Sequence, residues 1–135
     1  MNAFNKISLA STLGILSLLV CTSAVAVPPD ISGTYKCSGI NPAANSPNFT
    51  ETVVLKKNKD TYNVQLIYNI IPYNIGTGIF NKDVNDAFSY VYWDPKTPSS
   101  FGSVFFTIKP DGSLEGVFSN YNENKPGTET CTKSS

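Results

Sequence analysis

Few residues in this 135-residue chain could take part in chemistry, because it contains no histidine and only three cysteines. Histidine is the commonest general acid or base in enzymes, so its absence argues against catalysis. The remaining candidates are carboxylates, most of which fall in predicted turns, where such residues form local hydrogen bonds: Asp83, Asp86, Asp94, Asp111, Glu115 and Glu123. Glu129 lies in a predicted strand instead, and we expect it to accept hydrogen bonds from neighbouring backbone. We therefore predict no catalytic residue, no cofactor and no enzymatic activity.

Cys37 and Cys131 are the two cysteines expected in the mature chain, and we predict that they form a disulfide. An exported protein meets an oxidising compartment, in which a pair of cysteines is normally bonded. A metal site is the competing interpretation, but the chain has neither histidine nor a CxxC spacing. No metal ligand is predicted.

The N-terminal residues 1–26 resemble a secretory signal peptide. Lys6 precedes an apolar run at residues 7–20 that is too short to span a bilayer, and Ala24-Val25-Ala26 provides small residues for cleavage. The mature protein is then a single domain, residues 27–135, in the periplasm or secreted. Lipid anchoring through Cys21 is the alternative, but Val20 stands where lipoprotein signals carry a small residue.

The charges of the chain are balanced and scattered, with ten basic and ten acidic residues. Nucleic-acid binding requires a concentrated basic stripe, usually rich in arginine, and this sequence has no arginine. We therefore expect no nucleic-acid partner. No later apolar run is long enough for a transmembrane segment in the mature chain.

Short alternating runs separated by turn residues predict an all-β protein. We place eight strands at residues 31–38, 49–57, 61–69, 75–80, 87–93, 101–109, 113–119 and 127–132. Pro110-Asp111-Gly112 is the clearest hairpin turn between them. The longer connections, 39–48 and 94–100, are expected to be loops.

A disulfide between the first and last strands predicts an eight-stranded antiparallel up-and-down barrel. In an open meander these strands would lie at opposite edges, too far apart for a bond between Cys37 and Cys131. Closing the sheet makes them neighbours. A β-sandwich is the alternative, because it can also bring the chain ends together.

Alternation along the strands separates an inner face from an outer face. We expect the lumen to contain mainly aromatic side chains: Tyr35, Tyr62, Tyr68, Phe88, Tyr90, Tyr92, Phe106 and Phe118. So many rings favour a filled interior over a ligand cavity. Four apolar residues in the outward phase of the fifth to seventh strands form a candidate interface: Val91, Trp93, Phe105 and Val117.

Several short motifs resemble those of small bacterial extracytoplasmic barrels of the avidin and lipocalin (calycin) type. They are Gly33-Thr34-Tyr35, Gly76-Thr77-Gly78-Ile79, Asp111-Gly112-Ser113-Leu114-Glu115-Gly116 and Gly127-Thr128-Glu129. The resemblance implies the barrel fold. It does not extend to a biotin site, because Trp93 is the only tryptophan. Tyr35-Lys36-Cys37-Ser38-Gly39 and Cys131 also resemble periplasmic lysozyme-inhibitor barrels.

These observations leave three functions open. The first is a non-enzymatic binding or interaction protein that acts through the outer apolar patch, on a protein partner or another copy of itself. The second is binding of a small apolar ligand in the barrel lumen. The third is inhibition of a host or foreign hydrolase such as lysozyme.

Overall fold

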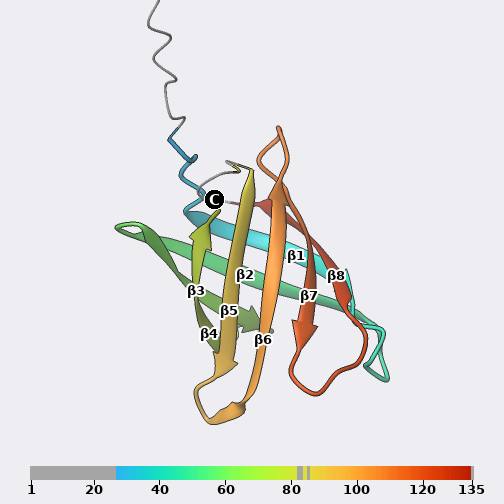
Figure 1. Cartoon of the computed structure of the whole chain (residues 1–135). Helices are drawn as coiled ribbons and strands as arrows, with labels where there is room; N and C mark the ends of the chain where they lie inside the picture. The colour runs from blue at the N-terminus through green and yellow to red at the C-terminus, as the bar shows by residue number, and fades with distance from the viewer. Residues whose placement is uncertain (1–26, 82–83, 85, 135) are drawn as a thin grey trace, which may run out of the picture.

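The chain folds into one closed antiparallel barrel (Figure 1). A computed structural model describes residues 27–81, 84 and 86–134, so the predicted signal peptide lies outside the described residues. Eight strands follow in order: β1 (Gly33–Ile40), β2 (Asn48–Asn58), β3 (Thr61–Tyr68), β4 (Ile71–Phe80), β5 (Ala87–Asp94), β6 (Thr97–Ile108), β7 (Leu114–Asn120) and β8 (Gly127–Lys133). Each pairs with the next, and β8 pairs with β1, which confirms the predicted barrel. Within the described ranges, no helix has the length and apolarity needed to cross a membrane.

The disulfide lies where the barrel closes. Cys37 on β1 and Cys131 on β8 are directly opposite each other, with their α-carbons 4.0 Å apart and an S–S bond of 2.05 Å. Both cysteines are buried, at 3% and 0% exposure. The bond therefore crosslinks the first and last strands inside the barrel, as predicted.

The alternation of β3 shows how the sequence builds the wall. Tyr62, Val64 and Leu66 are buried, whereas Asn63 between them is exposed. Successive side chains of a strand point to opposite faces, so one polar and one apolar face follow directly from the sequence.

One end of the barrel is closed by the segment that precedes β1. Ile31 is 5% exposed, and its carbonyl accepts a hydrogen bond of 2.9 Å from the hydroxyl of Tyr35. The hydroxyl of Tyr62 accepts from the backbone N–H of Ile31 and donates to the carboxylate of Asp30, at 3.3 and 3.2 Å. These bonds satisfy the polar atoms of two buried tyrosines, so the segment can seal this end.

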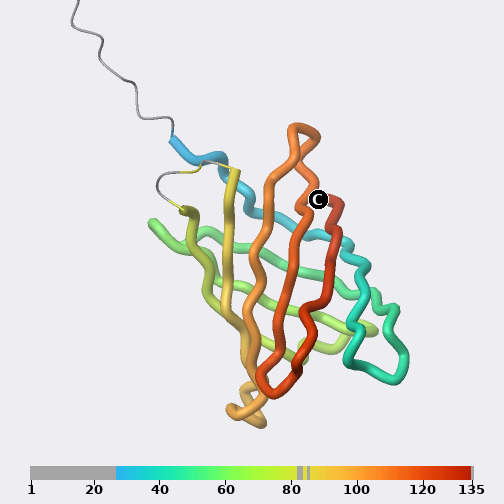
Figure 2. The backbone as a smooth tube through the Cα atoms, turned by 45° about the vertical axis from the view of Figure 1, so that its right-hand side comes forward, coloured from blue at the N-terminus to red at the C-terminus, as the bar shows by residue number. Residues whose placement is uncertain are grey.

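The two ends of the barrel carry different connections (Figure 2). The N-terminal segment and the β6–β7 turn lie at the upper end in this view, whereas the β1–β2, β5–β6 and β7–β8 connections lie at the lower end. At the β6–β7 turn, the N–H of Lys109 donates to the carbonyl of Ser113 at 2.8 Å, and Gly112 has φ of 82°. The predicted Pro110-Asp111-Gly112 hairpin is confirmed.

Two predicted strand starts were wrong by four residues, those of β4 and β6. β4 begins at Ile71 rather than residue 75, because Asn69 and Ile70 form a tight turn with φ of 46° and 66°. The predicted loop 94–100 is also shorter, since β6 begins at Thr97 and pairs with Asp94. The carboxylate of Asp94 accepts from the N–H of Lys96 at 2.8 Å and closes this turn locally.

Candidate functional site

The lower end of the barrel opens into a cavity of about 640 Å³. Sites that hold small molecules commonly have volumes of about 300–1,000 Å³ and mostly apolar walls. Six aromatic side chains contribute to the lining: Phe49, Tyr68, Tyr73, Tyr90, Tyr92 and Phe118. The predicted filled interior is therefore found only in the closed half.

The aromatic rings do not fill the centre of the cavity, because they lie along the barrel wall over glycines of neighbouring strands. A Cβ on Gly127 would overlap the Phe118 ring, and one on Gly102 would come within 2.5 Å of Cζ of Tyr92. Phe49 covers Gly39 in the same way. Because each ring occupies the volume of a missing side chain, the centre of the open half stays empty.

A pair of carboxyl groups lies at the base of the cavity. Glu129 on β8 is 3% exposed and forms a side-chain hydrogen bond with Glu51 on β2. Burial, followed by this hydrogen bond and by the charge of Glu51, raises the pKa of Glu129 to about 9. The Glu129 carboxyl group therefore holds a proton at neutral pH. The predicted role of Glu129 as an acceptor for neighbouring backbone is replaced by this side-chain pairing.

A β-bulge turns Tyr73 toward the carboxyl pair. Leu66 pairs with Asn74 and Ile67 with Pro72, so Tyr73 is the extra residue on β4. A bulge of this kind can aim two successive side chains at the same face. Tyr73 and Asn74 both line the cavity, and the Tyr73 hydroxyl donates to a carboxylate oxygen of Glu51.

A second polar chain crosses the mouth of the cavity. The Tyr92 hydroxyl donates to the side-chain oxygen of Asn120, whose Nδ2 donates to Glu123 at 2.8 Å. The other carboxylate oxygen of Glu123 accepts from Nδ2 of Asn41 at 3.2 Å. This chain joins β5, β7 and the two connections that frame the mouth, so the rim is held by side-chain bonds.

Two buried polar atoms beside the cavity have no hydrogen-bond partner among the described residues. They are the hydroxyl of Tyr90, which is 2% exposed as a residue, and Oε1 of Glu129. An unpaired buried polar group costs about 1–3 kcal/mol. A molecule in the cavity that supplied the missing partners would recover this cost.

The tyrosines around the pair are held in their neutral form. Burial, and then the negative charges of Glu129 and Glu51, raises the pKa of Tyr90 well above its ordinary value of 10. Burial and Glu51 raise the pKa of Tyr73 and Tyr92 in the same way. All three hydroxyls therefore remain hydrogen-bond donors.

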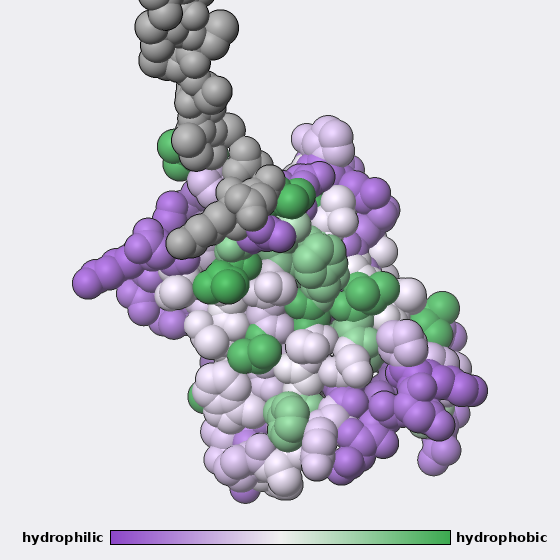
Figure 3. Space-filling model, in the orientation of Figure 1, coloured by the Kyte–Doolittle hydropathy of each residue, from purple (hydrophilic) through white to green (hydrophobic). Residues whose placement is uncertain are grey.

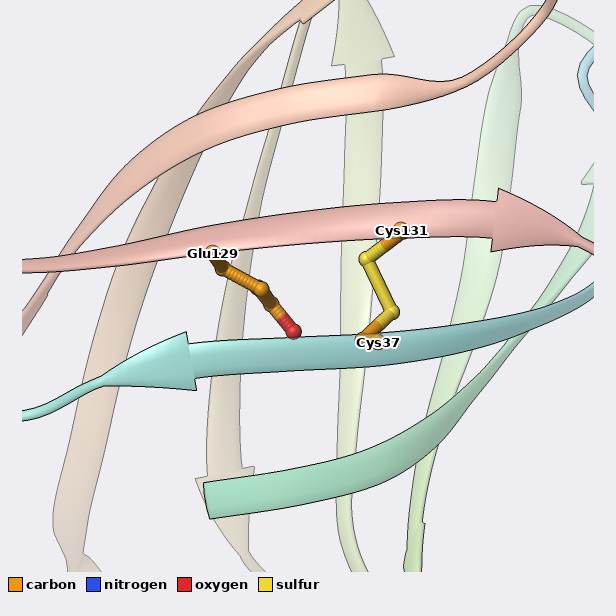
Figure 4. Close-up of side chains that lie close together, drawn as sticks. All are labelled: Cys37, Glu129 and Cys131. Carbon is orange, nitrogen blue, oxygen red and sulfur yellow. A yellow bond between two sulfur atoms is a disulfide. The ribbon is translucent and has the colours of Figure 1, made fainter. Parts of the chain in front are cut away.

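The disulfide lies next to Glu129 (Figure 4). The sulfur atoms of Cys37 and Cys131 and a carboxylate oxygen of Glu129 lie within 4.8 Å of one another. Because the two sulfurs are bonded to each other, they offer no thiolate to a metal ion. Among the described residues, no other cluster of three such groups occurs.

The predicted lumen residues divide between the two halves of the barrel. Tyr35, Tyr62, Phe88 and Phe106 are almost fully buried and are absent from the cavity wall. Tyr90, Tyr92 and Phe118 are buried and line the cavity. Tyr68 also lines the cavity, but it is 53% exposed, because it lies at the end of β3.

Among the cavity residues that sequence reasoning missed are Glu51, Tyr73, Asn74 and Asn120. Glu51 follows the inward phase of Phe49 and Val53 on β2, a signal that the sequence contains. Asn120 likewise continues the inward phase of β7. Tyr73 and Asn74 depend on the early start of β4 and on its bulge, for which the sequence offers only the neighbouring Pro72 as a signal.

The predicted carboxylates outside the cavity have local roles. Asp111 accepts from the N–H of Ser113 at 2.9 Å, and Glu115 forms an ion pair of 2.6 Å with Lys109. Asp86 accepts at its backbone carbonyl from the N–H of Ile108. Asp83 lies outside the described residues.

The outer face of β4–β7 carries apolar side chains beside small hydroxyl residues, and Figure 3 shows hydrophobic side chains gathered there. Val91, Phe105 and Val117 are each 50% exposed, and Trp93 is half-buried. The strand register arranges this face in three rows across the sheet. The rows are Ile79, Ser89, Phe105 and Val117; Thr77, Val91, Ser103 and Ser119; and Ile75, Trp93, Phe101 and Tyr121. None of these twelve residues is charged.

Comparison with known proteins returned no match to a protein-family model and no significantly similar curated sequence. The site is therefore interpreted from its own geometry.

Proposed function

We propose that this protein is an exported, non-enzymatic binding protein that holds a small molecule in the open end of its barrel. The observation that carries the proposal is the cavity of about 640 Å³, with orphaned polar atoms of Tyr90 and Glu129 beside it. Aromatic walls with a few converging polar groups are typical of ligand sites. The disulfide crosslinks β1 to β8, and the opposite end of the barrel is closed, so the cavity opens at one end only. Both features support a ligand site at the open end.

The architecture supports the same function. Eight-stranded barrels of the lipocalin and avidin kind can hold one small ligand. We place this chain with that calycin-type group as a proposal, on its strand order and its short glycine motifs. Export follows from residues 1–26, and N-terminal sequencing of protein recovered outside the cytoplasm should begin at Val27.

Binding of the neutral, apolar dye N-phenyl-1-naphthylamine tests the proposed cavity. We expect dye fluorescence to rise in the presence of the mature, disulfide-bonded protein. Asn74→Phe should weaken dye binding by about tenfold or more, because Asn74 is 9% exposed on the cavity wall and a larger ring there would occupy the space. Equal dye binding by the folded Asn74→Phe variant would contradict the proposal.

Phe105→Ser is the matched control for this experiment. Phe105 is 50% exposed on the outer face and does not line the cavity. Dye binding to this variant should match that of the parent. Thermal melts of both variants would establish that each is folded at the assay temperature.

A second candidate function is self-association through the outer face of β4–β7. Twelve outward positions without a charged residue, including half-exposed Phe105 and Val117, form the specific observation that supports it. Apolar patches of this kind on soluble proteins often mark interfaces. We propose a second copy as the occupant, because two uncharged faces can pack without burying an unpaired charge.

The double variant Trp93→Ser/Phe105→Ser tests this second function. It should keep the fold of the monomer and sediment as a monomer at concentrations where the parent forms a dimer. A parent that remains monomeric at millimolar concentration would contradict self-association. A collapse of the variant's melting temperature would show instead that these side chains stabilise the barrel itself.

A further inference from the structure

The cavity has charges of only one sign. The described residues that line it include two carboxyl groups, those of Glu51 and Glu129, and no lysine. The whole chain has neither arginine nor histidine. The third carboxylate near the mouth, Glu123, bonds to two asparagines of the lining and also carries no basic partner there. A ligand with a carboxylate or phosphate would therefore meet no positive charge in this cavity.

Two buried polar atoms at the base of the cavity lack hydrogen-bond partners, and their chemistry indicates which partners would fit. The protonated Glu129 carboxyl shares its proton with Glu51, which leaves Oε1 as an acceptor, and the oxygen of Tyr90 can accept as well as donate. Both residues are at least nine-tenths buried, at 3% and 2% exposure. Glu51, which hydrogen-bonds to Glu129 and Tyr73, adds a further acceptor at the same place. Oε1 of Glu129, the carboxylate of Glu51 and the oxygen of Tyr90 therefore offer three acceptors at this end of the site.

Aromatic rings surround these acceptors. Tyr90 and Tyr92 have ring centroids 6.0 Å apart, and Phe49 and Phe118 pack edge to face at 5.5 Å. Ring faces carry negative electrostatic potential and attract organic cations. The same rings would also cover the apolar body of a ligand. The charge and the lining of the cavity therefore both favour a ligand that joins a cationic group to an apolar body.

We propose that the cavity binds an organic ammonium ion, a primary or secondary amine that carries an aromatic or apolar body. This inference rests on the proposed binding function and adds its ligand class. An ammonium group has up to three N–H donors for Glu129, Glu51 and the Tyr90 oxygen. Its positive charge is stabilised by the carboxyl pair and by the rings, and hydrogen bonds to a charged donor are about twice as strong as neutral ones.

Three probes that differ only in their end group test the ligand class by calorimetry at pH 7. They are tryptamine, tryptophol and indole-3-propionate, which end in an ammonium, a hydroxyl and a carboxylate. We expect tryptamine to bind at least about tenfold more tightly than tryptophol, and indole-3-propionate to bind most weakly. Tryptophol or indole-3-propionate binding as tightly as tryptamine would overturn the inference.

The double variant Glu51→Gln/Glu129→Gln removes the charge while keeping the side-chain shapes. Its preference for tryptamine over tryptophol should fall close to one, while tryptophol binding persists. Glu115→Gln is the control, because Glu115 is exposed on the outside of β7 and should leave the preference unchanged. A preference that survives in the double variant would also overturn the inference.

The dye experiment separates this inference from the proposed function. Dye binding in the cavity without any tryptamine preference would reject the ammonium ligand and leave small-molecule binding in place. Absence of both dye and tryptamine binding would reject both. Dye binding together with tryptamine preference that depends on Glu51 and Glu129 supports both.

Discussion

Glu129 on β8 lies directly opposite Gly39 on β1, which has no side chain. On its other side Gly39 pairs with Phe49 of β2, whose ring covers it. The seam strand β1 is therefore open at this point, and the carboxyl group of Glu129 can reach across it to Glu51. Glu129 of the carboxyl pair and the Phe49 ring of the cavity wall therefore both lie beside this one glycine.

Gly39→Ala should destabilise the barrel by about 1–3 kcal/mol, because its Cβ would lie 2.5 Å from Cζ of Phe49 and also close to the backbone of Thr128. Urea denaturation of the parent and the variant measures the change. Ser38→Ala is the control, since Ser38 is exposed and should shift stability little. Equal stability of parent and Gly39→Ala would show that the Phe49 ring does not lie over β1.

Glu129 should make the protein more stable in acid. Its pKa is raised from 4.5 to about 9 on folding, so between these values the folded state binds more protons than the unfolded state. Stability contributed by this group is fully present below pH 4.5 and is lost as pH rises toward 9. Glu129→Gln does not titrate, so its stability relative to the parent should increase by more than about 1 kcal/mol from pH 4 to pH 9.

Urea denaturation of the parent and Glu129→Gln at several pH values measures this difference in stability. The contributions of the other titrating groups are present in both proteins and largely cancel in the difference. The matched variant Glu115→Gln, changed at an exposed carboxylate, should show a nearly constant difference from the parent. A Glu129→Gln curve parallel to that of the parent would mean that Glu129 is not buried with its proton.

Ile70→Gly should stabilise the protein by about 0.5–2 kcal/mol. Ile70 has φ of 66° and is 94% exposed at the tip of the β3–β4 hairpin. A β-branched residue is strained in this conformation, whereas Asn-Gly is the preferred pair for such a turn. Thermal melts should show a higher midpoint for Ile70→Gly. In contrast, Ile79→Gly in β4 should lower it, because Ile79 occupies a regular strand position.

The disulfide should be complete in natively exported protein, and its loss should cost about 4–5 kcal/mol in the chain-entropy model, because it joins residues 94 positions apart. Mass spectrometry after alkylation without reduction should detect no free thiol at Cys37 or Cys131. Cys37→Ala/Cys131→Ala should melt at a lower temperature than the parent. Alkylation of both cysteines in unreduced protein would contradict the closure of the seam.

Much of the fold could be predicted because its signals are local. Alternation in β3 assigned Tyr62, Val64 and Leu66 to the interior, and Pro110-Asp111-Gly112 located a hairpin. The missed start of β4 has a physical reason. Asn69-Ile70 is an unusual turn, since isoleucine rarely adopts positive φ, so no local preference indicated a hairpin there.

The candidate site was predicted only in part. The strand alternation correctly placed three cavity residues on the inner face: Tyr90, Tyr92 and Phe118. A count of inward rings could not show, however, where empty space remains between them. Glu129 was recognised as unusual within a strand, whereas its partner Glu51 is 78 residues away in sequence. Their contact depends on strand register across the seam, which is a property of the closed sheet.

The sequence by itself determined the all-β class and the strand order, because alternation and turn residues are readable along the chain. It also determined the pairing of Cys37 with Cys131 once Cys21 is assigned to the predicted signal peptide. Only the tertiary structure decided where the barrel is full and where it is hollow. Rings such as Phe49 and Phe118 lie over glycines of adjacent strands, and a bulge adds Tyr73 to the wall. Cavities depend on which side chains meet across strands, and that is set by register and closure.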